Sequence, residues 1–114
     1  IIKEADKAAD ELEKDGISCE IIDLRTVKPL DYEAILKSVK KTNRLVILEE
    51  AWPFGNVATE VTYHVQAHAF DYLDAPIVKI NTADTPAPYS PVLLEEWLPN
   101  SNEVVKAVKK VMYK

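Results

Sequence analysis

Four large aliphatic residues in succession, Leu45-Val46-Ile47-Leu48, constrain the fold of this chain more than any other feature. The run is too short for a helix, because Pro53 and Gly55 follow soon after it. An unbroken aliphatic run of this length is typical of a strand buried on both faces, as parallel strands covered by helices are. The sequence therefore predicts an interior strand of an α/β sheet.

Helices and strands alternate on either side of this run. Apolar residues at helical spacing, together with polar caps, predict helices over residues 2–15, 31–41, 56–68 and 100–112. Strand-like runs occur at 17–24, 45–48 and 77–81, and a loop is expected over 70–76. Four prolines predict that residues 82–99 form an extended strap without regular structure over most of its length. This alternation is typical of a three-layer α/β/α fold with a mostly parallel sheet.

A strand before the first helix is missing from this alternation. The first strand of such a fold commonly lies in the middle of the sheet, so its absence predicts a slot between the strands at Ile17 and Leu45. We therefore expect residues 1–114 to be one domain, a fragment of a longer chain that lacks the first strand or strands of its sheet.

The composition narrows the classes of partner. A net charge of −5 and a pI near 5.0 argue against nucleic acid or an anionic membrane surface and favour a basic partner. No stretch approaches a membrane span, and the single cysteine, Cys19, lies in an apolar run that predicts a buried, reduced thiol. With two glycines, the chain has no glycine-rich phosphate loop. These features predict a soluble, intracellular protein.

Two groups of side chains could carry chemistry. Glu49 and Glu50 could act as an acid and a base, but adjacent strand residues point to opposite faces, which favours a structural or interface role. Glu60, His64 and His68 recur at every fourth position of the third predicted helix and could bind a metal. Because the row runs beside buried valines, a pair of histidines at an interface or at the edge of the core is the favoured interpretation.

Acidic and aromatic residues gather in the loops around the third predicted strand. Asp71, Asp74 and Asp84 lie there with Tyr72 and Tyr89. Such a mixture is suited to docking a partner rich in arginine and lysine. Loop solubility and helix capping explain the same residues equally well.

Five segments resemble the carboxyl-terminal domains of pyruvate dehydrogenase beta subunits, which have the transketolase carboxyl-terminal fold. In order, they are Ile22-Asp23-Leu24-Arg25-Thr26-Val27-Lys28-Pro29-Leu30-Asp31, Lys41-Thr42-Asn43-Arg44-Leu45-Val46, Glu49-Glu50-Ala51-Trp52-Pro53, Ala69-Phe70-Asp71-Tyr72-Leu73-Asp74-Ala75-Pro76 and Ala83-Asp84-Thr85-Pro86-Ala87-Pro88-Tyr89. The beta subunits of branched-chain 2-oxoacid and acetoin dehydrogenases share much of this pattern. The alternative function is that of an independent binding module with the same fold, which uses its acidic loops to bind a basic partner.

The resemblance implies membership of an oxidoreductase complex. In that family, α2β2 enzymes use thiamine diphosphate and Mg²⁺ to decarboxylate pyruvate, and they transfer the acetyl group to lipoyl groups. The cofactor lies between the alpha subunit and the amino-terminal domain of the beta subunit. The resemblance carries no catalytic, cofactor-binding or metal residue onto this chain, so we expect it to bind no cofactor and to be inactive alone. We also expect a bacterial cytoplasmic protein rather than a mitochondrial one.

The resemblance implies two contacts for this domain: one with a second beta subunit and one with the basic subunit-binding domain of the dihydrolipoyl acetyltransferase. Asp74, within Leu73-Asp74-Ala75-Pro76, and the C-terminal carboxylate match the acidic groups that bind the acetyltransferase. Asp71 is expected to contribute beside them. Lys114 departs from the family pattern by bringing a positive charge to this position.

Overall fold

The computed structural model describes residues 2–24, 31–51, 54, 56–83, 86 and 88–113. Five α-helices, one 3₁₀ helix and two strands are assigned within these residues. In chain order they are α1 (Ile2–Lys14), α2 (Tyr32–Thr42), β1 (Val46–Leu48), α3 (Val57–Ala69), η1 (Phe70–Tyr72), β2 (Val78–Ile80), α4 (Pro91–Trp97) and α5 (Ser101–Val111). No helix of this part of the chain has both the length and the apolar character needed to cross a membrane.

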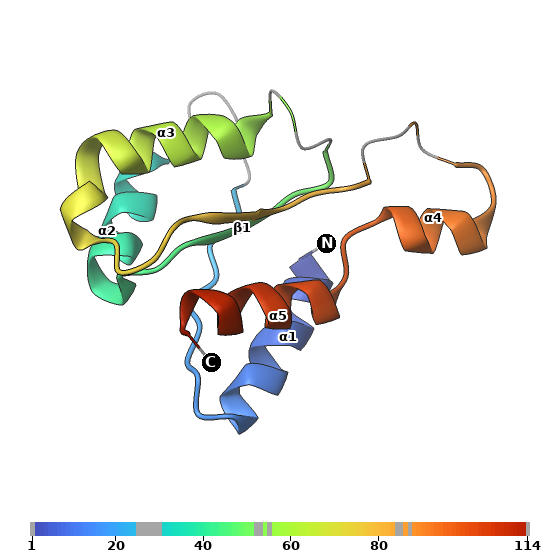
Figure 1. Ribbon diagram of the computed structural model, residues 1–114, viewed down its shortest axis with the longest axis horizontal. Coiled ribbons are helices and arrows are strands. Elements are labelled where there is room, and N and C mark those ends of the chain that lie inside the picture. Colours follow the sequence, from blue (N-terminus) through green and yellow to red (C-terminus); the bar gives the residue numbers. More distant parts are fainter. Residues whose placement is uncertain are drawn as a thin grey trace.

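The two strands are parallel and lie between two helical layers (Figure 1). Val46 pairs with Val78, and Leu48 pairs with Ile80. Helices α2 and α3 cover one face of the sheet, whereas α1 and α5 cover the other. The α/β/α layering and the parallel strand direction confirm the predicted fold class.

Alternate residues of β1 face different helical layers, because successive strand side chains point to opposite faces. Leu45 and Ile47 pack against α2 and α3, where Val39 and Val65 are fully or almost fully buried. Val46 and Leu48 pack on the other side with residues of α1 and α5. All three residues of β1 are only half-buried, which corrects the expectation of a strand buried on both faces.

Local signals set the helix ends as predicted. At the start of three helices, the side-chain oxygen of the cap residue accepts a hydrogen bond from the backbone N–H three residues later. The cap residues are Asp31, Asn56 and Asn100. Gly16 follows α1 with a φ of 78°, a left-handed conformation that glycine adopts without strain.

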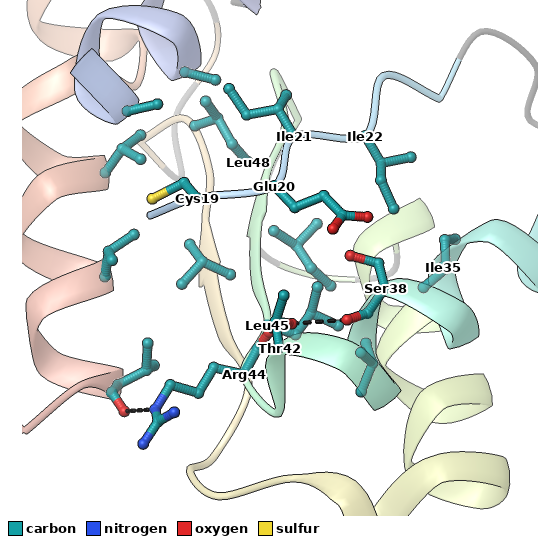
Figure 2. Close-up of a pocket in the computed structure, with 18 of the residues that line it drawn as sticks. Cys19, Glu20, Ile21, Ile22, Ile35, Ser38, Thr42, Arg44, Leu45 and Leu48 are labelled. Atoms are coloured by element: carbon teal, nitrogen blue, oxygen red, sulfur yellow. Dashed lines mark hydrogen bonds between the residues drawn. The ribbon is translucent and has the colours of Figure 1, made fainter. Parts of the chain in front are cut away.

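The segment Ile17–Leu24 forms no strand, so that prediction was wrong. Within the part of the chain that the structure describes, Ser18–Leu24 makes no backbone-to-backbone hydrogen bond. In both Figure 1 and Figure 2 the segment runs across the direction of β1 rather than alongside it. A strand exists only through pairing with a neighbour, and no described segment pairs with these residues.

Cys19 on this segment is exposed, which corrects the prediction of a buried thiol. Nearby aliphatic side chains still desolvate its sulfur enough to raise the pKa of the thiol above its ordinary value.

Two short helices occur where irregular structure was expected. Helix α4 forms inside the proline-rich strap, because Pro91 occupies the first helical turn, where its missing N–H costs nothing. It buries none of its residues and projects from the body of the molecule (Figure 1). The 3₁₀ helix η1 extends α3 into the predicted loop at 70–76.

Candidate functional site

Asp71 and Asp74 both lie on the segment that joins α3 to β2, and both are exposed. This segment is held against the end of α2. The backbone N–H of Asp74 donates to the carbonyl oxygen of Asn43 over 2.8 Å, and the Asn43 side-chain amide donates to the carbonyl oxygen of Tyr72, also over 2.8 Å. Asn43 caps α2 in the left-handed conformation, with φ 65°. The structure thus brings the two predicted aspartates together on one anchored segment.

Arg44 joins this segment to the end of α5. Its Nε donates to the carbonyl oxygen of Val111 over 3.0 Å (Figure 2), and its Nη1 lies 3.9 Å from Oδ2 of Asp74. The Asp74 side chain remains 59% exposed. A contact at this distance on an exposed carboxylate is weak, so Asp74 keeps its capacity to bind an external cation.

Three exposed aromatic residues are neighbours of the aspartates: Phe70 and Tyr72 flank Asp71 in the sequence, and Tyr113 bonds to Asp74. Phe70 is 65% exposed, Tyr72 44% and Tyr113 71%. The Tyr113 hydroxyl donates to the carbonyl oxygen of Asp74 over 3.1 Å, which brings the chain after α5 to this position. We call Phe70, Asp71, Tyr72, Asp74 and Tyr113 the acidic–aromatic surface. Aromatic residues are enriched at the core of surfaces that bind other proteins, and polar residues form the rim of such surfaces.

Sequence reasoning did not include Tyr113 and Arg44 in this surface. Lys114, which it did include, lies outside the described residues, as does Asp84. Tyr89 is fully exposed at the start of the α4 region. Asp74 and Tyr113 are 39 positions apart, so the sequence pattern does not show their contact. The one sequence signal for Tyr113 was its position next to Lys114.

The histidines of α3 form a row of neighbouring rings with Tyr32 of α2. The Tyr32 and His64 rings stack with centroids 3.7 Å apart, and His68 follows 4.4 Å from His64. Desolvation, and secondarily the charge of His68, lower the pKa of His64. Among the described residues, no group of three histidine, cysteine, aspartate or glutamate side chains is placed to hold a metal ion.

Glu49 has a structural role, as the sequence favoured. Its Oε2 accepts from the backbone N–H of Ala58 over 3.2 Å, and its Oε1 accepts from the side-chain amide of Asn81 over 2.7 Å. One carboxylate therefore ties the end of β1 to the start of α3 and to the residue after β2. Glu50 is exposed, and no described residue binds its side chain.

Comparison with known proteins agrees with the fold. Residues 1–104 match the family described as transketolase, C-terminal domain. The pyruvate dehydrogenase E1 component subunit beta of Rickettsia felis is 51% identical over 112 residues, which are 98% of this chain and 34% of that protein. The same subunit of Rhizobium meliloti is 55% identical over 108 residues, 95% of this chain and 24% of the relative. The mitochondrial subunit of Mus musculus is 45% identical over 107 residues, 93% of this chain and 30% of the relative.

The chain thus spans between about a quarter and a third of the length of these curated relatives. The family match covers most of the chain, and its fold agrees with the layered α/β/α architecture. The chain belongs to the transketolase C-terminal domain family and is a relative of the beta subunits of pyruvate dehydrogenase.

Proposed function

We propose that this chain is the carboxyl-terminal domain of a pyruvate dehydrogenase beta subunit. In that role it belongs to an α2β2 enzyme that decarboxylates pyruvate and transfers the acetyl group to lipoyl groups. The observation that carries the proposal is identity of 51% to 55% with two bacterial beta subunits over nearly the whole chain. Since the mouse mitochondrial subunit is 45% identical, the same comparison favours a bacterial cytoplasmic enzyme.

The domain's own task in this proposal is to hold subunits together. The acidic–aromatic surface would dock the basic subunit-binding domain of the acetyltransferase component. Asp74 supports this assignment, because its carboxylate is exposed and has only the distant Arg44 as an ionic partner within the described residues. The exposed rings of Phe70, Tyr72 and Tyr113 supply the apolar contact area that a charge pair alone lacks.

The residues described here do not fit thiamine diphosphate with its magnesium ion. A cavity of about 510 Å³ lies beside β1, but four carboxylates (Glu20, Asp23, Glu49 and Glu50) and a single cation, Arg44, line it. This excess of negative charge repels a diphosphate. We therefore propose that the cofactor is bound by other parts of the assembly, and that this domain performs no step of the reaction.

Replacing Asp74 tests the docking proposal. In the assembled enzyme, Asp74→Asn should weaken binding of a purified subunit-binding domain by about 1–3 kcal/mol, because the basic partner loses its charged acceptor. Isothermal titration calorimetry at low salt measures this difference.

Asp6→Asn is the matched control, since it removes the same charge from an exposed position on α1, which contributes nothing to the acidic–aromatic surface. Unchanged affinity of the Asp74→Asn enzyme at low salt would remove the docking proposal while leaving the family membership intact.

A further inference from the structure

The two histidines of the chain lie four positions apart on α3, in the helical layer that this helix forms with α2 (Figure 1). The His64 and His68 rings have centroids 4.4 Å apart, and their planes are inclined by 42°. Residues four positions apart are neighbours on the surface of a helix, so the two imidazoles share one face. His68 is exposed and His64 is half-buried. Two metal-binding side chains therefore lie next to each other where solvent reaches them.

Tyr32 holds one of the two rings in place. Its ring stacks on that of His64 with centroids 3.7 Å apart and planes inclined by 19°. Tyr32 also packs against the core cluster that contains Ile35 and Val65, so it is itself fixed. A stacked ring covers the face of an imidazole, whereas a metal ion binds at the edge, along the lone pair of a ring nitrogen. Tyr32 therefore leaves the edge of His64 available and lowers the entropy cost of ordering this ligand.

The separation of the two imidazole rings matches one coordination geometry. With metal–nitrogen bonds of about 2.0–2.1 Å, two imidazoles bound at right angles to one ion have centroids about 4.4–4.5 Å apart. Tetrahedral coordination would separate the same centroids by about 5.2 Å. The observed 4.4 Å agrees with the right-angled arrangement. Square-planar and tetragonal sites with such angles are typical of Cu²⁺ and Ni²⁺.

The described part of the chain supplies two ligands at this position. Glu60 precedes His64 by four positions, but no group of three histidine, cysteine, aspartate or glutamate side chains among the described residues is placed to hold a metal ion. Glu60 is therefore not counted as a ligand, and water would fill the other positions of the ion. Mg²⁺ prefers an octahedral shell of oxygen ligands, so the histidine pair does not suit it.

We propose that His64 and His68 form a two-ligand site for a divalent transition-metal ion that prefers square-planar coordination. One nitrogen of each imidazole occupies adjacent positions of the ion. Cu²⁺ binds most tightly, and Ni²⁺ and Zn²⁺ bind more weakly, in keeping with the general order of affinities of these ions. The site shares no residue with the acidic–aromatic surface, so its failure would leave the docking proposal and the family membership intact.

Isothermal titration calorimetry with Cu²⁺ tests the site in the full-length protein that contains this chain. His68→Gln should weaken the binding of one Cu²⁺ per chain at least tenfold, because a single imidazole cannot chelate the ion. Since His68 is exposed, this variant should keep the fold, which circular dichroism checks. The control is Gln66→Ala, which changes an exposed residue on another face of the same helix and should leave the affinity unchanged.

Pulsed electron paramagnetic resonance identifies the ligands of the bound Cu²⁺. With one equivalent of Cu²⁺ per chain, the difference between the spectra of the unaltered protein and His68→Gln should show the nitrogen couplings of two imidazoles. Equal Cu²⁺ affinity of these two proteins, an equal loss in Gln66→Ala, couplings of one imidazole only, or tighter binding of Zn²⁺ than of Cu²⁺ would each overturn the proposal. A loss in Glu60→Gln as large as that in His68→Gln would also overturn it, because it would indicate a third ligand.

Discussion

Glu49 contacts two elements at once, which makes it the most informative single residue for stability. Glu49→Gln should lower the free energy of unfolding by about 1–3 kcal/mol. The new side chain has one oxygen and one NH₂ group, so either the Ala58 N–H or the Asn81 amide would face a second donor and lose its acceptor. Urea denaturation at pH 7 measures the change. The control is Glu50→Gln, which should stay within about 0.5 kcal/mol, since no described residue binds that carboxylate. Equal effects of the two variants would contradict the structural role of Glu49.

His64 makes stability depend on pH in a defined direction. Its pKa is lowered by desolvation and by the charge of His68, so protonation favours the unfolded chain. The contribution of His64 is therefore complete above the ordinary histidine pKa of about 6.5 and is lost as the pH falls from there through the lowered folded-state pKa. NMR titration of the imidazole protons should show the pKa of His64 rising in the His68→Gln variant. A pKa that does not move would exclude His68 as a cause.

At the scale of elements, the segment Ser18–Leu24 and strand β1 should differ sharply in local stability. Val46–Leu48 are paired with β2, whereas Ser18–Leu24 have no backbone hydrogen bond within the described chain. In the dilute, isolated chain, hydrogen exchange followed by mass spectrometry should find fast exchange along Ser18–Leu24 and slower exchange at Ile47, which faces β2. Full protection along both segments would show that the sheet is closed without an added strand.

At the scale of the whole molecule, our proposal is that the fold serves as a framework and that the reaction centre lies on other parts of the enzyme. Among the described residues, no three side chains are placed to hold a metal ion. Most of the charged side chains that line the cavity beside β1 are carboxylates. We therefore expect the isolated 114-residue chain to release no carbon dioxide from pyruvate when thiamine diphosphate and Mg²⁺ are supplied. Turnover, or stoichiometric binding of the cofactor in a calorimeter, would contradict the framework role. The complete α2β2 enzyme is the positive control.

The sequence by itself determined where the four longer helices lie, whereas α4 and η1 were not predicted. Caps such as Asp31, Asn56 and Asn100 bind backbone groups three residues away, and helical periodicity is set within a few turns, so neither depends on distant parts of the chain. The aliphatic run at Leu45–Leu48 identified β1 for a similar reason, because a run that packs against two helical layers is visible in the local composition. Asp71, Asp74 and Asp84 were grouped on the loops around the third predicted strand, and the structure describes the first two of them on the segment between α3 and β2.

Only the tertiary structure decided which segments pair and what surrounds the candidate surface. Ile17–Leu24 has the composition of a strand, but a strand requires a neighbour, and sequence composition cannot supply one. Arg44 reaches Val111 across 67 positions of the chain, and Tyr113 reaches Asp74 across 39. Such contacts arise when helical layers pack on a sheet, because packing places side chains by spatial position rather than by their separation in sequence.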